Sequence, residues 1–436
     1  MNLESFPITI EPVMNKIPAT CVIRNAKQLV TLHTPGHIGP RGGKAMSELG
    51  IIEKGAIAFS GSRIVAVGET NKLLKSISIT RKTKMIDATN RVITPGLIDC
   101  HSHPVFAGGR AHEFEMRISG KSYLEIAEAG GGIKATVKAT QKASPKRLFN
   151  NGKKVLDEMF SWGVTTVEGK SGYGLTLKDE IKMLKVLNKL NHEHDIDIVT
   201  TFLGAHEIPE EYKNKPDEYV ALVCNRMIPA VVADNLAEFC DVFCEKGVFS
   251  PKQTRIILQT AQAFGLKLKI HADQFHSTGG AELAAEFRAV SADHLDCVGD
   301  EGIHLIRKAG VVPVLLPGSI FILGAKQKAP ARKMIDYGLP VALGTDFNPG
   351  SSPIHSLPIT MSLACIEFKM TPAEALCAAT LNAAYAIDRG DKIGCLSPGK
   401  MADIVIWDVQ DYREITYWFG KNLVYSVFKN GHEIKP

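Results

Sequence analysis

The middle of the chain alternates short apolar runs with amphipathic stretches. The apolar runs have the length of buried strands, and eight of them occur at residues 96–100, 164–168, 197–203, 241–244, 266–271, 289–294, 310–315 and 340–344. The stretches between them, such as SPKRLFNNGKKVLDEMFSW and TLKDEIKMLKVLNKLNHEH, have helical spacing. The last helix, TPAEALCAATLNAAYAI, is expected to begin with a capping box at Thr371 and Glu374. Eight buried strands separated by helices predict an α/β protein with a (β/α)₈ barrel.

Both ends of the chain have a different pattern. Residues 20–92 contain short strand-like runs with turn signals, and FSGSRIVAVG has the pattern of a hairpin. The segments KMADIVIWDVQ and NLVYSVFKNGHEI near the C-terminus repeat this pattern. We therefore expect a small β-sandwich domain formed by residues 1–93 and 389–436, with the barrel at residues 94–388.

Composition and charge exclude several functional classes. The 436 residues are 45% hydrophobic and 22% charged, which is ordinary for a soluble globular enzyme. The net charge of +5 is not concentrated in a basic block, so we expect no nucleic-acid partner, whereas a small anionic substrate is compatible with it. The first residues, MNLESFPITIEPVMNKIP, lack the basic and apolar pattern of a secretory signal, and no apolar run is long enough for a membrane. With nine cysteines that show no repeated spacing, this pattern leads us to expect a cytoplasmic location with reduced thiols.

Histidine and aspartate occur where four predicted strands end. The first strand leads into His101 and His103, the fifth ends in His271, the sixth ends in His294, and Asp346 follows the eighth. Active sites of such barrels lie at these strand ends. In an extended segment, residues two apart point to the same side, so His101 and His103 can face one ion. Each residue alone has a plausible structural role, but their joint position favours a catalytic zinc or iron site with a place left for water.

Two motifs bracket the barrel and resemble the amidohydrolase superfamily. They are PGLIDCHSH at 95–103, where the barrel begins, and PGKMADIV at 398–405, where the chain returns to the β domain. Finer motifs narrow the resemblance to the imidazolonepropionase family: HPVFAGGR, GGGI, GKSGYGL, TFLGAHE, DVFCEKGVFS, HADQF, SADHL and TDFNPGSSP. The resemblance implies that metal-activated water opens the cyclic amide of 4-imidazolone-5-propanoate to N-formimidoyl-L-glutamate in histidine degradation. It also implies a homodimer.

The resemblance suggests a role for each candidate residue. One divalent metal per chain, zinc or iron, is expected on His101, His103, His271 and Asp346. His294 is the stronger candidate for the general base and Asp346 the alternative. His206 is expected to contact the substrate ring or carbonyl and, with His294 as the alternative, to stabilise the oxyanion.

The substrate contacts are expected to come from several loops. Arg110, seven residues after His103, can bind the propionate carboxylate bidentately. The other candidates are Tyr123, Tyr173, His206, Gln274, Asn348, Gly350 and Ser351. Tyr173 lies between two glycines, in a segment that we expect to be a mobile loop.

Three alternatives are open at this point. A related deaminase would have glutamate at position 274 to shuttle protons, whereas Gln274 cannot transfer a proton. A binuclear enzyme would bridge two metals through a carboxylated lysine after the fourth strand, but Lys246 is expected to face solvent. A non-catalytic scaffold of the same fold would be expected to lack metal ligands, which this chain retains.

Overall fold

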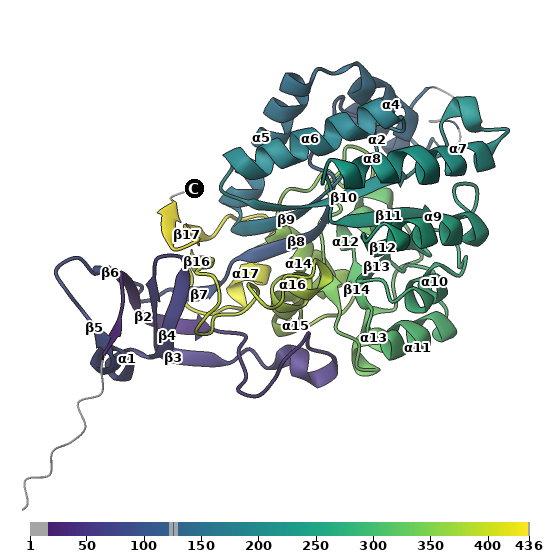
Figure 1. Ribbon diagram of the computed structural model, residues 1–436. Coiled ribbons are helices and arrows are strands. Elements are labelled where there is room, and N and C mark those ends of the chain that lie inside the picture. The colour runs from purple at the N-terminus through teal and green to yellow at the C-terminus, as the bar shows by residue number, and fades with distance from the viewer. Residues whose placement is uncertain (1–15, 122–124, 126–129, 435–436) are drawn as a thin grey trace, which may run out of the picture.

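The computed structural model describes residues 16–121, 125 and 130–434. A barrel surrounded by helices forms the larger part, and a sheet-rich part lies beside it (Figure 1). The predicted substrate residue Tyr123 lies outside the described residues.

Eight parallel strands form the barrel sheet and are hydrogen-bonded to one another in chain order. They are β8 (Leu97–Ser102), β9 (Val164–Lys170), β10 (Asp197–Ala205), β11 (Phe239–Cys244), β12 (Lys267–Ala272), β13 (Ser291–His294), β14 (Val312–Leu315) and β15 (Ala342–Leu343). A bridge between Ser102 and Phe347 joins the first strand to the segment after the last. The predicted (β/α)₈ barrel is confirmed, because each predicted apolar run overlaps one of these strands.

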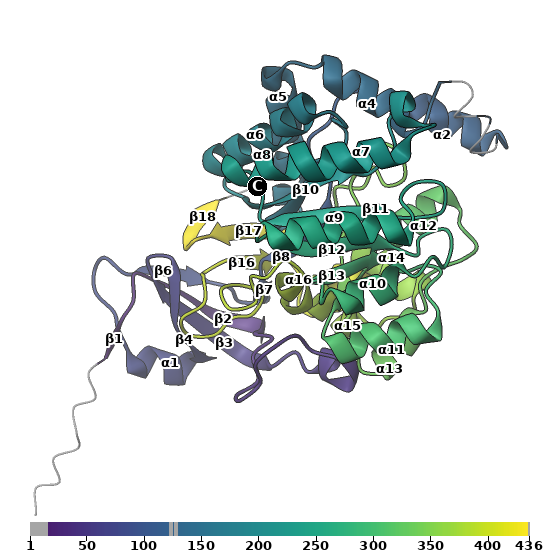
Figure 2. The ribbon, with the colours of Figure 1, turned by 45° about the vertical axis from the view of Figure 1, so that its right-hand side comes forward.

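The helices cover the outside of the barrel, and turning the molecule by 45° brings α9 to the front of this layer (Figure 2). They include α2 (Ala111–Ile118), α4 (Ile133–Lys142), α5 (Pro145–Ser161), α6 (Leu177–Glu193), η2 (Glu210–Tyr212), α7 (Pro216–Leu222), η3 (Val223–Met227), α8 (Ile228–Ala233), α9 (Pro251–Ala263), α10 (Gly280–Glu286), α11 (Asp300–Ala309), α12 (Pro317–Leu323), α13 (Ala331–Asp336), α14 (Leu357–Glu367) and α17 (Glu414–Tyr417). The hydroxyls of Ser144 and Thr176 cap α5 and α6 by accepting backbone hydrogen bonds. Among the described residues, no helix has both the length and the apolar composition to cross a membrane.

The last predicted helix is two helices, and this part of the prediction is wrong. The capping box of Thr371 and Glu374 is present at the start of α15 (Pro372–Ala378), but a new helix, α16, begins at Leu381 and ends at Ala386. Thr380 interrupts them with φ −133° and ψ −89°. The break frees the carbonyl of Ala379, which accepts a hydrogen bond from the Ile98 amide of β8. A tertiary contact thus outweighs a helical pattern that continues through the break.

The second sheet combines strands from both ends of the chain. Its order is β18 (His432–Ile434), β17 (Val424–Lys429), β16 (Ile404–Trp407), β7 (Val92–Pro95), β2 (Cys21–Val30), β3 (Ile51–Ser60) and β4 (Arg63–Glu69), with β6 (Lys84–Asp87) paired to β2. The purple and yellow strands therefore lie side by side in Figure 1. The predicted hairpin is β3 and β4.

Apolar side chains cover both faces of this sheet. One cluster includes Ile23, Ile57 and Ile406, and the other includes Val22 and Leu73. The second cluster packs beside β1 (Ile17–Pro18), β5 (Ile77–Ser78) and α1 (Thr70–Ser76), and η1 (Gly43–Ser47) lies nearer the barrel. The predicted small sandwich built from both termini is confirmed, while its boundaries at residues 93 and 389 stay a prediction.

Candidate metal centre and active site

The histidine and aspartate side chains from four strand ends meet in one buried cluster. Ligand atoms of His101, His103 and Asp346 lie within 4.8 Å of one another, and so do those of His101, His271 and His294. Oδ1 of Asp346 is 3.6 Å from Nε2 of His101 and 3.7 Å from Nε2 of His103. These distances leave room for an ion between the side chains.

The backbone at two of these strand ends is unusual. His294 has φ 73° and Asp346 has φ 52°, which is the left-handed region that non-glycine residues rarely adopt. The Asp346 amide donates a 2.9 Å hydrogen bond to the His101 carbonyl, which fixes the aspartate beside the first strand. Such backbone conformations cost free energy and persist where the surroundings impose them, as at functional sites.

Burial favours the neutral form of three of these imidazoles. It lowers the pKa values of His101, His103 and His294 well below the usual range, with neighbouring histidines and Lys170 adding to the shift. Burial also raises the pKa of Asp346 to about 7. Nε2 of His101 is buried and has no hydrogen-bond partner among the described residues. Neutral imidazoles, an unpartnered ring nitrogen and a carboxylate form a donor set that fits a divalent transition metal.

Two aspartates deeper in the barrel orient two of the imidazoles. Oδ2 of Asp293 lies 2.6 Å from Nδ1 of His101, and Oδ2 of Asp241 lies 2.9 Å from Nδ1 of His271. A proton on Nδ1 of His101 would be directed to Asp293, so Nε2 of His101 is left to face the cluster. Asp241 holds His271 by this close contact and by accepting a 3.2 Å hydrogen bond from the His271 amide at Oδ1. The sequence interpretation did not include these aspartates.

His206 and Tyr173 form one wall of the cluster. The His206 ring stacks on His103 with centroids 5.3 Å apart, and the Tyr173 ring lies 5.3 Å from His206. Nδ1 of His206 is 3.0 Å from the Gly172 carbonyl, so this nitrogen is the donor, and Nε2 makes no hydrogen bond to the part of the chain that the structure describes. Burial lowers the pKa of His206 to about 3 and raises that of Tyr173.

The loop that holds Tyr173 is fixed rather than mobile, so this prediction is wrong. The buried carboxylate of Glu180 accepts hydrogen bonds from the amides of Gly172 and Gly174 at 3.1 and 2.7 Å. A Cβ atom at position 174 would lie 2.5 Å from the backbone of α6, so only glycine allows this close approach. Glu180 was missed because it belongs to a helix whose pattern is that of an ordinary amphipathic helix.

Arg110 lies on the same side of the cluster and is held by a buried glutamate. Its Nε and Nη2 are 2.8 and 2.7 Å from Oε2 of Glu113. The charges of Arg110 and Asp346 both act on the buried Tyr173, whose ring centroid lies 5.6 Å from that of His103. Nη1 of Arg110 is directed towards Gly350, because a Cβ atom there would be 2.0 Å from it.

The turn after Asp346 is held together by hydrogen bonds between its own residues. The amides of Gly350 and Ser351 both donate to Oδ1 of Asn348 at 2.8 Å, and Nδ2 of Asn348 donates to the Asp346 carbonyl at 2.6 Å. Asn348 therefore shapes this turn. The Ser351 hydroxyl also belongs to this turn, since it accepts a 2.9 Å hydrogen bond from Nδ2 of Asn348. The predicted substrate contacts of these residues remain predictions.

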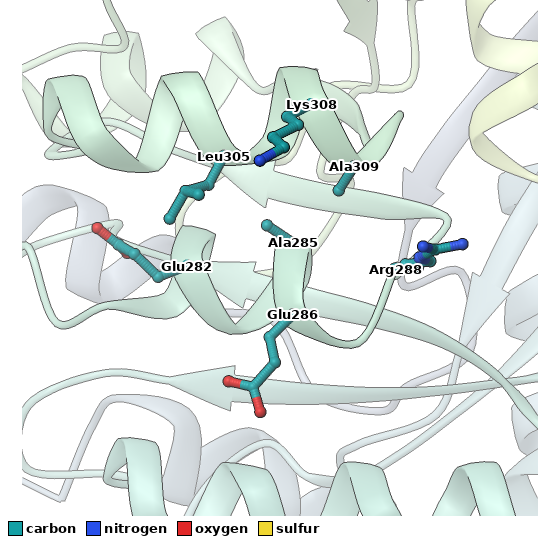
Figure 3. A pocket seen from close by; sticks show the side chains of 7 residues that line it. All are labelled: Glu282, Ala285, Glu286, Arg288, Leu305, Lys308 and Ala309. Atoms are coloured by element: carbon teal, nitrogen blue, oxygen red, sulfur yellow. The ribbon is translucent and has the colours of Figure 1, made fainter.

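Gln274 lines a half-open pocket beside the cluster together with Asp296, Cys297, Ser319 and Gln327. Burial raises the pKa of Asp296 to about 8. A second pocket, shown in Figure 3, lies between α10 and α11 on the outside of the barrel. The residues that line this second pocket include none of the predicted site residues, so we do not assign it to the active site.

Lys246, the candidate for a lysine that bridges two metals, does not face the buried cluster. Lys246 is exposed, as predicted, and the neighbouring Glu245 is buried and accepts hydrogen bonds from the Phe275 and His276 amides. The fully buried lysines Lys170 and Lys269 are paired with carboxylates inside the barrel. One metal per chain stays our expectation.

The chain resembles known proteins over nearly its whole length. Residues 92–434 match the amidohydrolase family. An imidazolonepropionase of Geobacillus kaustophilus is 52% identical over 94% of this chain and 96% of its own length. One of Alkaliphilus metalliredigens is 49% identical over the same shares.

Solved structures of more distant proteins share the fold. A triazine hydrolase variant matches with a TM-score of 0.72 and 19% identity, over 96% of this chain and 95% of that chain. A zinc-bound adenosine deaminase from Xanthomonas campestris matches with a TM-score of 0.70 and 19% identity, over 96% and 93%. Because the chain matches the family and is so similar to these bacterial enzymes over nearly its whole length, it belongs to the amidohydrolase family and, within it, to the imidazolonepropionases.

Proposed function

We propose that this protein hydrolyses 4-imidazolone-5-propanoate to N-formimidoyl-L-glutamate. The observation that carries the proposal is the position of Tyr173, which lies beside His103 and within the electrostatic reach of both Asp346 and Arg110. A ring held at the histidine cluster would thus have a cation within reach of its side-chain carboxylate. The identity to imidazolonepropionases supports this substrate over other cyclic amides.

His101, His103, His271 and Asp346 would hold the metal, since their donor atoms converge and burial lowers the pKa values of His101 and His103. When bound, a zinc or iron ion supplies a water whose pKa is lowered to about 7 and polarises a carbonyl oxygen. We expect one ion per chain.

His294 is placed to manage the proton. Its ring centroid is 5.2 Å from that of His271, and its Nδ1 is buried without a hydrogen-bond partner among the described residues. Burial lowers its pKa, so it is neutral at pH 7 and able to accept the proton that the attacking water loses. It can then protonate the ring nitrogen as the C–N bond breaks, which yields the carboxylate and the formimidoyl group. Asp346 remains the alternative base.

His206 presents a lone pair to the site. Because Nδ1 faces the Gly172 carbonyl, Nε2 of the neutral ring is an acceptor. This nitrogen can therefore accept a hydrogen bond from a ring N–H of the bound substrate. It can stabilise an oxyanion only after it has gained a proton. Arg110 would bind the propionate and Gln274 would orient the ring.

Turnover of freshly prepared substrate by the metal-loaded protein tests this proposal. The ultraviolet absorbance of the imidazolone should fall, formimidoylglutamate should appear, and metal-free protein should be inactive until zinc or iron is restored. His294→Ala should lower kcat by at least a hundredfold, the scale of one general base. Full turnover by that variant would show that His294 is not the general base. Release of ammonia from aminated heterocycles would favour a deaminase instead.

The remaining expectations concern the setting of the enzyme. A cytoplasmic homodimer without a nucleic-acid partner is what the sequence pattern and the family resemblance support. Size-exclusion chromatography with light scattering would test the dimer.

A further inference from the structure

A cluster of buried charges lies beneath the predicted metal ligands. Lys170, at the end of β9, is fully buried in the barrel. Its Nζ is 2.6 Å from Oδ2 of Asp241, 2.9 Å from Oε1 of Glu168 and 3.4 Å from Oδ2 of Asp293. An ammonium group has three N–H donors, so these three carboxylates can use all of them.

Two of these carboxylates also hold the predicted metal ligands. The Asp241 oxygen that contacts Lys170 is the one 2.9 Å from Nδ1 of His271. The Asp293 oxygen that contacts Lys170 is the one 2.6 Å from Nδ1 of His101. One lysine thus touches the partners of two ligands that come from different strands, β8 and β12.

We propose that Lys170 is a positioning residue that fixes the orientation of His101 and His271 towards the metal through Asp293 and Asp241. The inference rests on the proposed metal site. Without the ammonium, three carboxylates would face one another in a space from which water is excluded, and their repulsion would separate them. Asp241 and Asp293 would then lose the positions from which they hold the imidazoles.

Lys269 provides a matched control inside the same cluster. It is also fully buried, and its Nζ is 2.7 Å from Oε2 of Glu168. Its other hydrogen bond goes to the Cys100 carbonyl at 3.3 Å. Burial raises the pKa of Asp293 and the charge of Lys269 opposes this shift, yet no hydrogen bond joins Lys269 to either aspartate among the contacts of the described residues. Removing it deletes the same buried charge without deleting a contact to a histidine partner.

Cobalt titration of metal-free protein separates the two lysines. Lys170→Met should weaken Co²⁺ affinity at least tenfold, in line with the loss reported for removing groups that orient metal ligands. It should also change the intensity of the visible Co²⁺ bands, which report ligand geometry. Lys269→Met should change affinity less than threefold, although both variants should lower the melting temperature. Asp293→Asn, which leaves Lys170 in place, should weaken Co²⁺ binding to a similar extent as Lys170→Met.

Several outcomes would overturn the inference. The role of Lys170, but not the metal site, would be refuted if Lys170→Met bound Co²⁺ with wild-type affinity and showed the wild-type visible bands. It would also be refuted if both lysine variants lost Co²⁺ affinity equally. If Lys170→Met does not fold, Lys170→Gln keeps two N–H donors without the charge and should bind Co²⁺ with intermediate affinity, while wild-type affinity there would refute the role. A wild-type chain that binds no Co²⁺ would instead refute the proposed metal site, and this inference with it.

Discussion

Arg110 offers the sharpest test of the substrate assignment. Its guanidinium is 12% exposed and is fixed by Glu113, whose side chain is 1% exposed. Two of its nitrogens are committed to Glu113, which leaves Nη1 for a ligand. The substrate's carboxylate would therefore meet a preoriented cation in a site with little water, where such a contact is strong.

The expected magnitude follows from this burial. A hydrogen-bonded carboxylate–guanidinium contact of this kind contributes about 3 kcal/mol, which corresponds to about 150-fold in kcat/KM. Removing Arg110 alone would leave the Glu113 carboxylate buried without its counter-ion, at a cost of about 3–5 kcal/mol in the free energy of unfolding. The test is therefore the double variant Arg110→Ala/Glu113→Gln, in which that charge is also removed.

The assay compares two substrates. For the true substrate, kcat/KM of the double variant should fall about 150-fold, mainly through KM. For a ring analogue without the carboxylate, wild type and variant should differ by less than threefold. Glu113→Gln alone controls for the loss of the orienting glutamate. The reasoning is refuted if the folded double variant retains wild-type kcat/KM for the propionate substrate.

Three further predictions follow from the geometry. Gly350→Ala places a Cβ atom 2.0 Å from Nη1 of Arg110 and should raise KM at least tenfold, whereas Gly109→Ala, which meets no atom within 4 Å, should not change steady-state kinetics. The pKa of buried Asp296 is raised to about 8, so at this carboxyl the native state binds more protons than the unfolded state, and the contribution of Asp296 to stability should fall as pH rises from about 4 through 8. Asp296→Asn should therefore gain stability relative to wild type between pH 6 and pH 9 in urea unfolding, and a pH-independent difference would contradict this. Seven of the nine cysteines are buried and burial raises thiol pKa values, so a disulfide reagent at pH 8 should titrate at most two thiols before unfolding and nine after it.

The convergence of the predicted metal ligands could be expected from the sequence because these residues follow strand ends. A buried parallel strand has an apolar run that is visible in the sequence, and the fold places the end of each run at one rim. His101 and His103 are two residues apart in such a run, so their common direction follows from strand geometry. The structure brings them to Asp346, 243 residues further along the chain, because the first and eighth strands are neighbours in a closed barrel.

The sequence could not show which of the buried charges beneath the histidine cluster contact one another. Lys170 and Asp241 are 71 residues apart, and nothing local to either shows the other. A signal was nevertheless present: Glu168 and Lys170 occur two apart in an otherwise uncharged strand, where buried charges are rare unless paired. That pattern predicts two charges pointing into the barrel, but only the fold shows which carboxylates they meet. The interrupted last helix escaped prediction for the same reason, since the cause at Ala379 is a contact with β8.

The origin of the oxygen atom in the product tests the central claim most directly. Metal-loaded protein would convert the imidazolone in water enriched in ¹⁸O, and mass spectrometry would follow the product. The account predicts one ¹⁸O atom in the newly formed carboxylate of formimidoylglutamate, with no ammonia released. A product without ¹⁸O in that carboxylate, or release of ammonia with the ring intact, would contradict hydrolytic opening of the cyclic amide at this cluster.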